Sequence, residues 1–472
     1  MKKFNKDKYL KKLRFKKYKR YLYIGIPCIL VLLIGIYFAY SKFSVFKEEE
    51  VVRTTVGEFI YGDVVIGAYI DGEYSNTIPG KNDGYVVKSV SCDNNAAGSW
   101  NNDSWGIIVT NLTKRTKCNV YFEKYTNADF ILGIAANDSV NFASDDADKN
   151  VRYIGANPNN YVYFNCSDYT NPTADTCELW RIIGVFNNVT KADGSKENLV
   201  KIIRDDSLGN YYWDYKKNGV GTSTSTNDFG SNDWSDSQLM MMLNPTNYLK
   251  SGYTNSGDII SSGSQQLYSK MGSYYNGIKG CKPTAVASGA SFSCTEVDFT
   301  STGLKNDTTR NAIEEVVWNL GGTGDYTSAS NGLASHWYGN ERGTTVYTGR
   351  PTTWTGKIGL MYPSDYGYAT SGGTTKDRAA CLAEELYNWD SSDFRDCKGN
   401  DYLLDANNNQ WTLAHHSAYP HIVFIMNAGG AAVGIYSAYS PNAVRPALFL
   451  KSNIQVDKGT GAKSDPYRLS VN

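Results

Sequence analysis

Residues 410–454 read QWTLAHHSAYPHIVFIMNAGGAAVGIYSAYSPNAVRPALFLKSNI, and this stretch decides the fold class of the chain. Its apolar runs are short and are separated by Gly, Pro, Ser and Asn, which is typical of successive β-strands. We expect strands at 421–427, 432–436 and 444–450, with ligand-facing loops near 415–420 and 437–442. Arg445 precedes the last strand, and we expect it to be a packed arginine bonded to loop carbonyls rather than a substrate clamp.

Residues in and beside these loops are the candidate contacts with a ligand. Tyrosine offers a flat apolar ring with a hydrogen-bonding tip and loses little rotamer freedom on binding, as in antibody paratopes. Histidine and asparagine add hydrogen-bonding groups. We therefore predict a ligand-binding surface at His415, His416, Tyr419, His421, Tyr436, Tyr439 and Asn442.

The same histidines are poor candidates for a metal site or for catalysis. Adjacent residues on a strand point to opposite faces, so His415 and His416 do not share a metal ion unless the chain bends there. No Asp or Glu lies between Asp405 and Asp457 to complete a ligand set. Ser417 is close, but no nucleophile-elbow pattern surrounds it. The sequence predicts no catalytic residue, no metal ligand and no cofactor.

The first 41 residues have the pattern of a membrane anchor. Residues 1–20 hold eleven Lys and Arg against the single acid Asp7, and residues 21–40, YLYIGIPCILVLLIGIYFAY, carry no charge. A helix of this length spans about 30 Å, the thickness of the hydrocarbon layer, and its basic flank stays in the cytoplasm. We expect a cytoplasmic tail at 1–20, a transmembrane helix at 21–41 and an extracellular remainder. A cleaved signal peptide is the alternative.

Eight of the nine cysteines follow this segment, and they fall into four couples that are close in sequence. An even number of cysteines outside a membrane indicates a disulfide framework. Zinc is the alternative, but the chain contains no CxxC spacing. Nearest-neighbour pairing joins Cys92 to Cys118, Cys166 to Cys177, Cys281 to Cys294, and Cys381 to Cys397.

The remaining chain divides into a stalk and two folded parts. Residues 42–56 are charged and short, residues 57–124 show several β-runs separated by turn signals, and residues 125–472 are rich in Gly, Ser, Thr, Asn and Tyr. We expect a small β-sandwich-like spacer at 57–124 and an irregular α+β domain at 125–472. The net charge of −10 after residue 20 disfavours nucleic acid as a partner.

Strand candidates in the large domain are 179–186, 199–204 and 356–362. Helix candidates lie at about 235–243, with a capping box at Ser235, and at about 308–320 and 376–389, where apolar residues recur on one helical face.

Two groups of motifs resemble a known family. They are LWRIIGVF, LVKIIRDDSLGN and NDWSDSQLMMMLN within 179–244, and QWTLAHHS, NAVRPALFLKSNI and DPYRL within 410–469. Together they resemble uncharacterised membrane-anchored bacterial surface proteins that carry a domain of unknown function related to the C-type-lectin fold, in the branch shared with formylglycine-generating enzymes. The resemblance implies that LWRIIGVF and the C-terminal strands pair near the base of the domain. It also implies a display surface at about 415–442.

The chain departs from the active members of these families. Formylglycine-generating enzymes use two close cysteines late in the fold to bind copper, whereas no cysteine follows Cys397. Calcium-dependent lectins use a Trp-Asn-Asp strand and a loop with a carboxylate. Residues 232–234 reverse that order, and residues 440–442 lack the carboxylate. Neither activity can therefore be carried over to this chain.

These observations predict a non-catalytic cell-surface protein whose extracellular C-type-lectin-like domain binds a carbohydrate or a protein ligand. The alternative is an envelope enzyme, most plausibly a glycan-acting hydrolase that would use a pair of carboxylates. Paired acids occur at 145–146, 205–206 and 314–315, but adjacent carboxylates more often lie on solvated faces.

Overall fold

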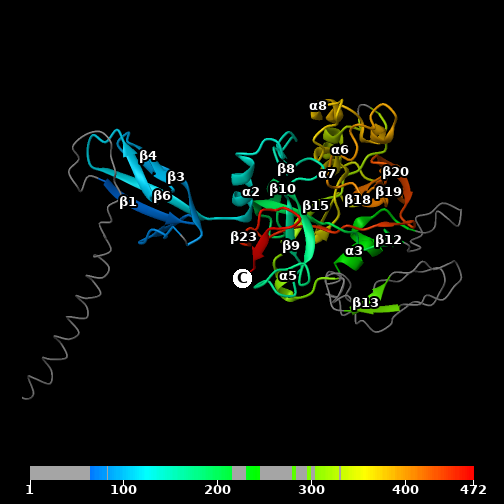
Figure 1. Cartoon of the computed structure of the whole chain (residues 1–472), viewed down its shortest axis with the longest axis horizontal. Helices are drawn as coiled ribbons and strands as arrows, with labels where there is room; N and C mark the ends of the chain where they lie inside the picture. The colour runs from blue at the N-terminus through cyan, green and yellow to red at the C-terminus, as the bar shows by residue number, and fades with distance from the viewer. Residues whose placement is uncertain are drawn as a thin grey trace, which may run out of the picture. The chain divides into compact units, whose positions relative to one another are not determined.

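The computed structural model describes residues 64–81, 83–214, 230–244, 279–282, 295–298, 303–328 and 331–471 (Figure 1). The expected tail at 1–20, transmembrane helix at 21–41 and stalk at 42–56 lie outside these residues. Within the described ranges, no helix combines the length and the apolar character needed to cross a membrane. The described residues form two compact units that divide between Tyr125 and Thr126.

The first unit is built from six strands. Four form a sheet in the order β2-β1-β6-β3, in which β1 runs parallel to β6 and β3 runs antiparallel to it, and β4 and β5 form a hairpin. Buried residues alternate along β6, at Thr116, Cys118, Val120 and Phe122, which is the period of a half-buried strand. The strands are β1 (Val64–Ile70), β2 (Glu73–Ser75), β3 (Tyr85–Cys92), β4 (Ala97–Asn101), β5 (Gly106–Thr110) and β6 (Thr116–Lys124).

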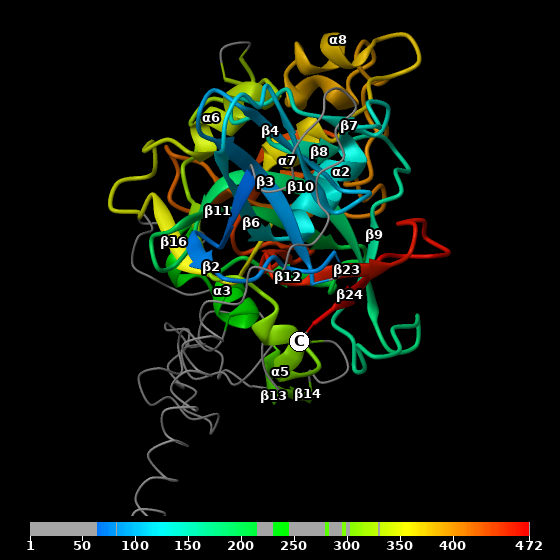
Figure 2. The same cartoon turned by 90° about the vertical axis from the view of Figure 1, so that its left-hand side faces the viewer.

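The second unit contains short strands and few, short helices, so its class is a strand-rich α+β fold (Figures 1 and 2). Its strands are β7 (Phe142–Ala143), β8 (Val151–Tyr153), β9 (Tyr161–Phe164), β10 (Glu178–Thr190), β11 (Lys196–Arg204), β12 (Asn210–Tyr212), β13 (Lys279–Lys282), β14 (Thr295–Asp298), β15 (Val316–Asn319), β16 (Thr353–Gly356), β17 (Ile358–Gly359), β18 (Gln410–His415), β19 (Ile422–Met426), β20 (Ala432–Ser437), β21 (Pro441–Ala443), β22 (Ala447–Phe449), β23 (Gln455–Lys458) and β24 (Arg468–Ser470). Its helices are α2 (Asn127–Ala135), η1 (Trp234–Asp236), α3 (Gln238–Leu243), α5 (Asp307–Asn311), α6 (Ala334–Glu341), α7 (Pro363–Tyr368), α8 (Arg378–Leu382) and η2 (Leu386–Asp390), where η marks a 3-10 helix.

The largest sheet has seven strands in the order β17-β22-β11-β10-β8-β7, with β9 also paired to β10. Strand β10 is buried from Trp180 to Phe186, as expected of a central strand. Gly184 faces β8 so closely that a Cβ there would lie 2.2 Å from the carbonyl oxygen of Val151. The C-terminal strand β22 pairs with β11, so the run LWRIIGVF shares its sheet without being hydrogen-bonded to it as a neighbouring strand.

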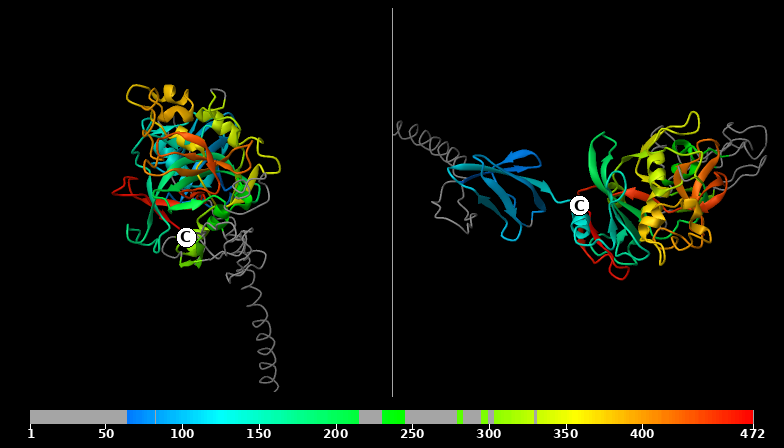
Figure 3. Two further views of the ribbon diagram at one scale, coloured as in Figure 1. Left: turned by 90° about the vertical axis from the view of Figure 1, so that its right-hand side faces the viewer. Right: turned by 90° about the horizontal axis from the view of Figure 1, so that it is seen from above.

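A second sheet has five strands in the order β12-β21-β18-β19-β20. Figure 3 (right) shows the orange strands of this sheet at the side of the unit away from the green strands β10 and β11. Side chains of both sheets share one hydrophobic core, in which the indole rings of Trp213, Trp234 and Trp411 lie within 5.8 Å of their neighbours, centroid to centroid. This core holds the five-stranded sheet in place.

Arg445 lies between the two sheets and is a structural residue, as predicted. It is buried, its Nε donates to the carbonyl of Arg204 at 2.9 Å, and its Nη1 donates to the carbonyl of Leu403 at 2.8 Å. A further bond at 3.3 Å reaches Oε1 of Gln410 at the start of β18. The guanidinium therefore ties β11, a loop and β18 together.

Two of the three predicted helices differ in extent from the observed ones, and the third differs in its cap. The helix expected at 308–320 ends at Asn311, and Val316–Asn319 instead form strand β15, which pairs with β16. Valine is stiff at χ1 and suits a strand, and alternating burial of Val316 and Trp318 replaces the helical stripe. The helix expected at 376–389 is two short pieces, α8 and η2. Helix α3 forms, but Ser237 caps it rather than Ser235.

Three of the predicted disulfides are confirmed: Cys92–Cys118, Cys166–Cys177 and Cys381–Cys397. Cys92 and Cys118 lie directly opposite each other on β3 and β6. Cys294 lies outside the described residues, and with it the fourth pair.

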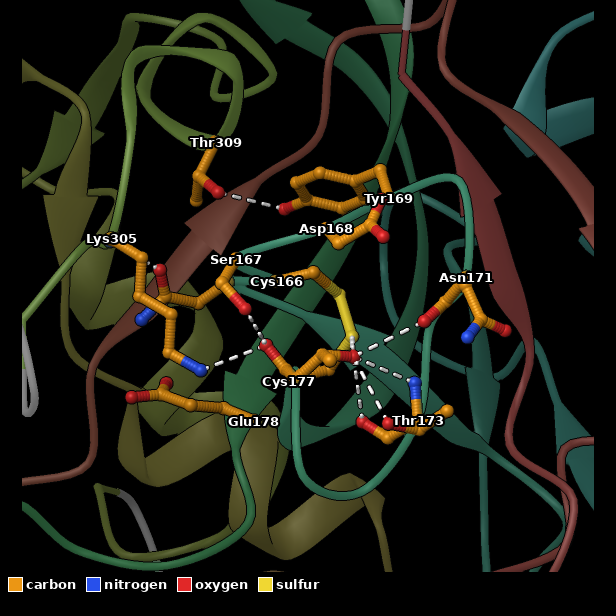
Figure 4. The surroundings of a disulfide bond; sticks show 12 residues. Cys166, Ser167, Asp168, Tyr169, Asn171, Thr173, Cys177, Glu178, Lys305 and Thr309 are labelled. Carbon is orange, nitrogen blue, oxygen red and sulfur yellow. Dashed lines mark hydrogen bonds between the residues drawn. A yellow bond between two sulfur atoms is a disulfide. The ribbon is translucent and has the colours of Figure 1, made fainter.

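Figure 4 shows how the Cys166–Cys177 loop is held against helix α5 and the chain before it. The hydroxyls of Tyr169 and Thr309 are 2.9 Å apart, and the Lys305 ammonium donates to the carbonyl of Thr176 at 2.9 Å. The disulfide and these bonds together fix a long loop that has little regular structure.

Candidate functional site

The predicted display loops lie together at one end of the five-stranded sheet (Figure 1). Strand β18 ends at His415, β19 starts at Ile422 and β20 ends at Ser437, and the pairing of Ile422 with Ser437 aligns these ends. The amide of Ala438 donates to the carbonyl of His421 at 2.7 Å. The turn from 416 to 421 and the turn from 438 to 440 are therefore neighbours.

Three predicted contact residues lie beneath this surface. His415, His416 and Asn442 are all buried, and none of them forms part of the exposed face. Neither ring nitrogen of His415 has a hydrogen-bond partner among the described residues. Burial, with smaller effects of Arg350 and His416, lowers the pKa of His415 to about 4. His415 is thus a neutral residue of the interior at physiological pH.

The exposed centre of the site is Tyr419. Its side chain is 55% exposed, and its ring meets the edge of the His416 ring at a centroid distance of 4.8 Å. The His416 ring in turn stacks on buried Phe424 at 5.7 Å, and its Nδ1 accepts a bond from the amide of Ala418 at 3.1 Å. The His416 ring therefore lies between Phe424 and Tyr419 and supports the tyrosine ring from the buried side.

Asn232 and Arg350 hold the backbone of the 416–421 turn. The side-chain amide of Asn232 donates to the carbonyls of His416, Tyr419 and Ile422 at 2.9, 2.9 and 3.2 Å. The guanidinium of Arg350 donates to Oδ1 of Asn232 at 3.3 Å and to the carbonyl of Pro420 at 3.4 Å. Asn232, which belongs to the segment with the composition but not the order of the lectin motif, thus shapes the loop from its buried side.

A second aromatic pair lies on the adjacent turn. His421 and Tyr439 stack with their rings 6.5 Å apart and nearly parallel, and both are partly exposed. Burial lowers the pKa of His421. Tyr436 is also partly exposed, and its hydroxyl accepts a bond from Nδ2 of Asn409 at 3.0 Å. These residues extend the aromatic surface toward β20.

The structure adds two tyrosines that the sequence analysis did not include in the site. Phe424 also contacts the ring of Tyr326 at 5.2 Å, and Tyr326 contacts Tyr387 at 5.6 Å, with Tyr387 39% exposed. The turn at Thr323–Asp325 is joined to the site because the amide of Ser417 donates to the carbonyl of Thr323 at 3.0 Å. These segments are almost a hundred residues apart in sequence, so no local pattern indicates their contact.

Three acids from the candidate pairs at 145–146 and 205–206 form ion pairs within the fold. Asp145 pairs with Arg378 at 2.9 Å, Asp146 with Arg152 at 3.0 Å, and Asp205 with Arg181 at 3.5 Å. In the described ranges, no three or more His, Cys, Asp or Glu side chains gather in a group that could hold a metal ion.

The candidate site is therefore a rigid aromatic surface at one end of the five-stranded sheet, and Tyr419 is its most exposed residue. Comparison of the chain with protein-family models, with curated proteins and with solved structures finds no match to any of them.

Proposed function

We propose that this chain is a single-pass cell-surface protein, with its N-terminus in the cytoplasm, whose second unit binds an extracellular carbohydrate or protein ligand without chemical turnover. The observation that carries the proposal is Tyr419, which is more than half exposed on a turn whose backbone is held from below by Asn232. A membrane anchor at 21–41 would place this surface outside the cell.

A large aromatic ring that is exposed on an ordered loop favours the binding of a ligand. A loop that is already ordered loses little conformational entropy on binding, so more of the contact energy remains as affinity. Asn232 and Arg350 supply that order through five hydrogen bonds to the turn and to each other. Tyrosine contributes a flat apolar face, which suits the apolar face of a sugar ring, and a hydroxyl that can donate or accept.

The finer fold assignment is part of the same proposal. We infer a C-type-lectin-like domain of the kind found in membrane-anchored bacterial surface proteins. The motifs at 179–244 and 410–469 support this assignment, and so does a sheet that combines β10 and β11 with the C-terminal strand β22. In such a domain the irregular loops form the recognition surface.

The test is binding of the purified full-length chain, in detergent, to a glycan array and to cell-envelope extracts. Tyr419→Ala is expected to weaken binding about tenfold or more, since central aromatic anchors carry most of the binding energy. Tyr74→Ala is the matched control, because Tyr74 is 60% exposed but belongs to the first unit. It should bind as the unchanged protein does.

A ligand that is released chemically altered would instead support the alternative, an envelope hydrolase. Equal binding by Tyr419→Ala and the unchanged protein would reject the site proposed above.

A further inference from the structure

A lysine and an aspartate that are not part of the aromatic surface meet in the interior of the second unit. Nζ of Lys201 on β11 lies 2.5 Å from Oδ2 of Asp365 on α7. The side chain of Lys201 is 0% exposed and that of Asp365 is 1% exposed. The ligand-binding proposal makes no use of this pair.

Aromatic rings form the walls around the pair. The Lys201 ammonium lies 4.6 Å from the ring centroid of Tyr362, 5.3 Å from that of Phe186 and 5.4 Å from that of Trp318. Burial lowers the pKa of Lys201, which makes the neutral, nucleophilic form of its amine easier to reach. The amine thus faces a carboxyl group in an apolar environment.

We propose that Lys201 and Asp365 condense to an intramolecular amide, which covalently joins β11 to α7. The ammonium group first gives one proton to the carboxylate, and the free amine then attacks Cγ of Asp365. Oδ2 leaves as water with two of the three ammonium protons, Nζ keeps the third, and Oδ1 remains as the amide oxygen. One positive and one negative charge disappear together, so the reaction needs no other reactant.

Electrostatics of the surroundings favour the product. Keeping an ion pair in a dry interior carries a large desolvation cost, which a neutral amide does not. The neighbouring pair of Arg152 and Asp146, joined at 3.0 Å and also buried, remains charge-balanced after condensation. Removal of the Lys201 and Asp365 charges therefore leaves no unpaired charge among these four residues.

Arg152 is also placed to assist the step. Its Nη1 donates to Oδ1 of Asp365 at 2.7 Å, and a cation at this oxygen stabilises the negative charge that develops there when the amine adds. Burial by itself raises the pKa of Asp365, but the charges of Lys201 and Arg152 outweigh it and hold the value at about 2. Proton transfer to the carboxylate is therefore an energetically unfavourable step that precedes attack by the amine.

The decisive experiment is a peptide map of the full-length protein after denaturation, reduction, alkylation and trypsin digestion. A lysine in amide linkage resists trypsin, so residues 197–204 should remain uncut after Lys201 and be joined to the peptide 358–376 that contains Asp365. The mass of the joined species should equal the sum of both peptides minus one water.

Two controls are built into the chain. The pair of Lys191 and Glu197 also forms a close contact, at 3.1 Å, but both side chains are partly solvated, so cleavage after Lys191 should be complete. The Lys201→Arg variant keeps the positive charge and should show no joined peptide. Complete cleavage after Lys201, with both peptides at their unmodified masses, would overturn the proposal, as would a joined species that persists in Lys201→Arg.

Discussion

His415 shows how burial turns a predicted contact residue into a determinant of stability. Its ring nitrogens are buried without partners, and its pKa falls from 6.5 to about 4 in the folded protein. The unfolded chain therefore binds more protons between these two values, and protonation favours unfolding. The stabilising contribution of neutral His415 is complete above about pH 6.5 and is lost as the pH falls toward 4.

We predict that His415→Gln removes part of this acid sensitivity. The free energy of unfolding of the unchanged protein should decline between pH 6.5 and 4 more steeply than that of the variant. Urea denaturation at a series of pH values measures the difference between the two slopes. Parallel slopes would show that His415 does not titrate on unfolding.

Glu341 has the opposite dependence on pH. Burial raises its pKa from 4.5 to about 7, and its Oε1 accepts a bond from the amide of Ser364 at 2.9 Å. The folded state then binds more protons than the unfolded state, so stability from this group is present below about pH 4.5 and is lost as the pH rises through 7.

We predict that Glu341→Gln gains stability over the unchanged protein as the pH rises from 5 to 8, because a neutral amide needs no proton to stay buried. Thermal denaturation of both proteins at pH 5 and pH 8 gives the comparison. A constant difference between them at the two pH values would contradict the prediction.

At the scale of elements, the 416–421 turn depends on one side chain from a distant segment. Asn232→Ala removes the bonds to two carbonyls of this turn and to the carbonyl of Ile422 at the start of β19, and should destabilise the protein by about 2 kcal/mol. We also expect faster hydrogen exchange of the amides from Ser417 to Ile422, and weaker ligand binding.

Asn244→Ala is the matched control for this prediction. Asn244 likewise bonds a backbone segment, through Nδ2 to the carbonyl of Ile358 at 2.7 Å and through Oδ1 to the amide of Ile358 at 2.9 Å. This variant should lose a similar amount of stability without faster exchange in the 416–421 turn. Equal exchange in both variants would show that Asn232 has no particular role there.

Strands and helices could be predicted from the sequence where the spacing of apolar residues fits only one type of secondary structure. The runs at 179–186 and 199–204 are short, mostly apolar and rich in β-branched residues, so they were correctly predicted as strands, which form β10 and β11. The segment around Val316 was misread because apolar residues at 313, 316, 317 and 320 fit one face of a helix. Pairing with β16, almost forty residues later, decides in favour of a strand.

The candidate site was predictable only in part for the same reason. Tyr419 and His421 belong to a loop that the local sequence marks as a turn. Asn232, Arg350 and Tyr326 reach the site through contacts across the fold, and periodicity over a short window carries no information about such contacts.

At the scale of the whole molecule, the described chain has two separate hydrophobic cores. One contains Phe122 and its neighbours in the first unit, and the other contains Leu413 and most buried residues of the second. Each core is enclosed by its own sheets, so each unit should unfold in a cooperative transition of its own.

We predict that single core truncations affect one transition each. Phe122→Ala and Leu413→Ala should each cost about 3–5 kcal/mol in the unit that contains the residue. Differential scanning calorimetry of the full chain should show one transition shifted to lower temperature and the other unchanged. A shift of both transitions by either variant would mean that the two units unfold together.

The position of β22 has a consequence for biosynthesis. This strand, Ala447–Phe449, lies between β11 and β17 and is bonded to both, although it comes much later in the chain than either. The ribosome must therefore synthesise the chain as far as residue 449 before the largest sheet can close. The first unit, whose strands all precede residue 125, can fold as soon as it emerges, whereas the second must wait with its core open. Chaperones and proteases therefore have most access to this protein while its second unit is being synthesised.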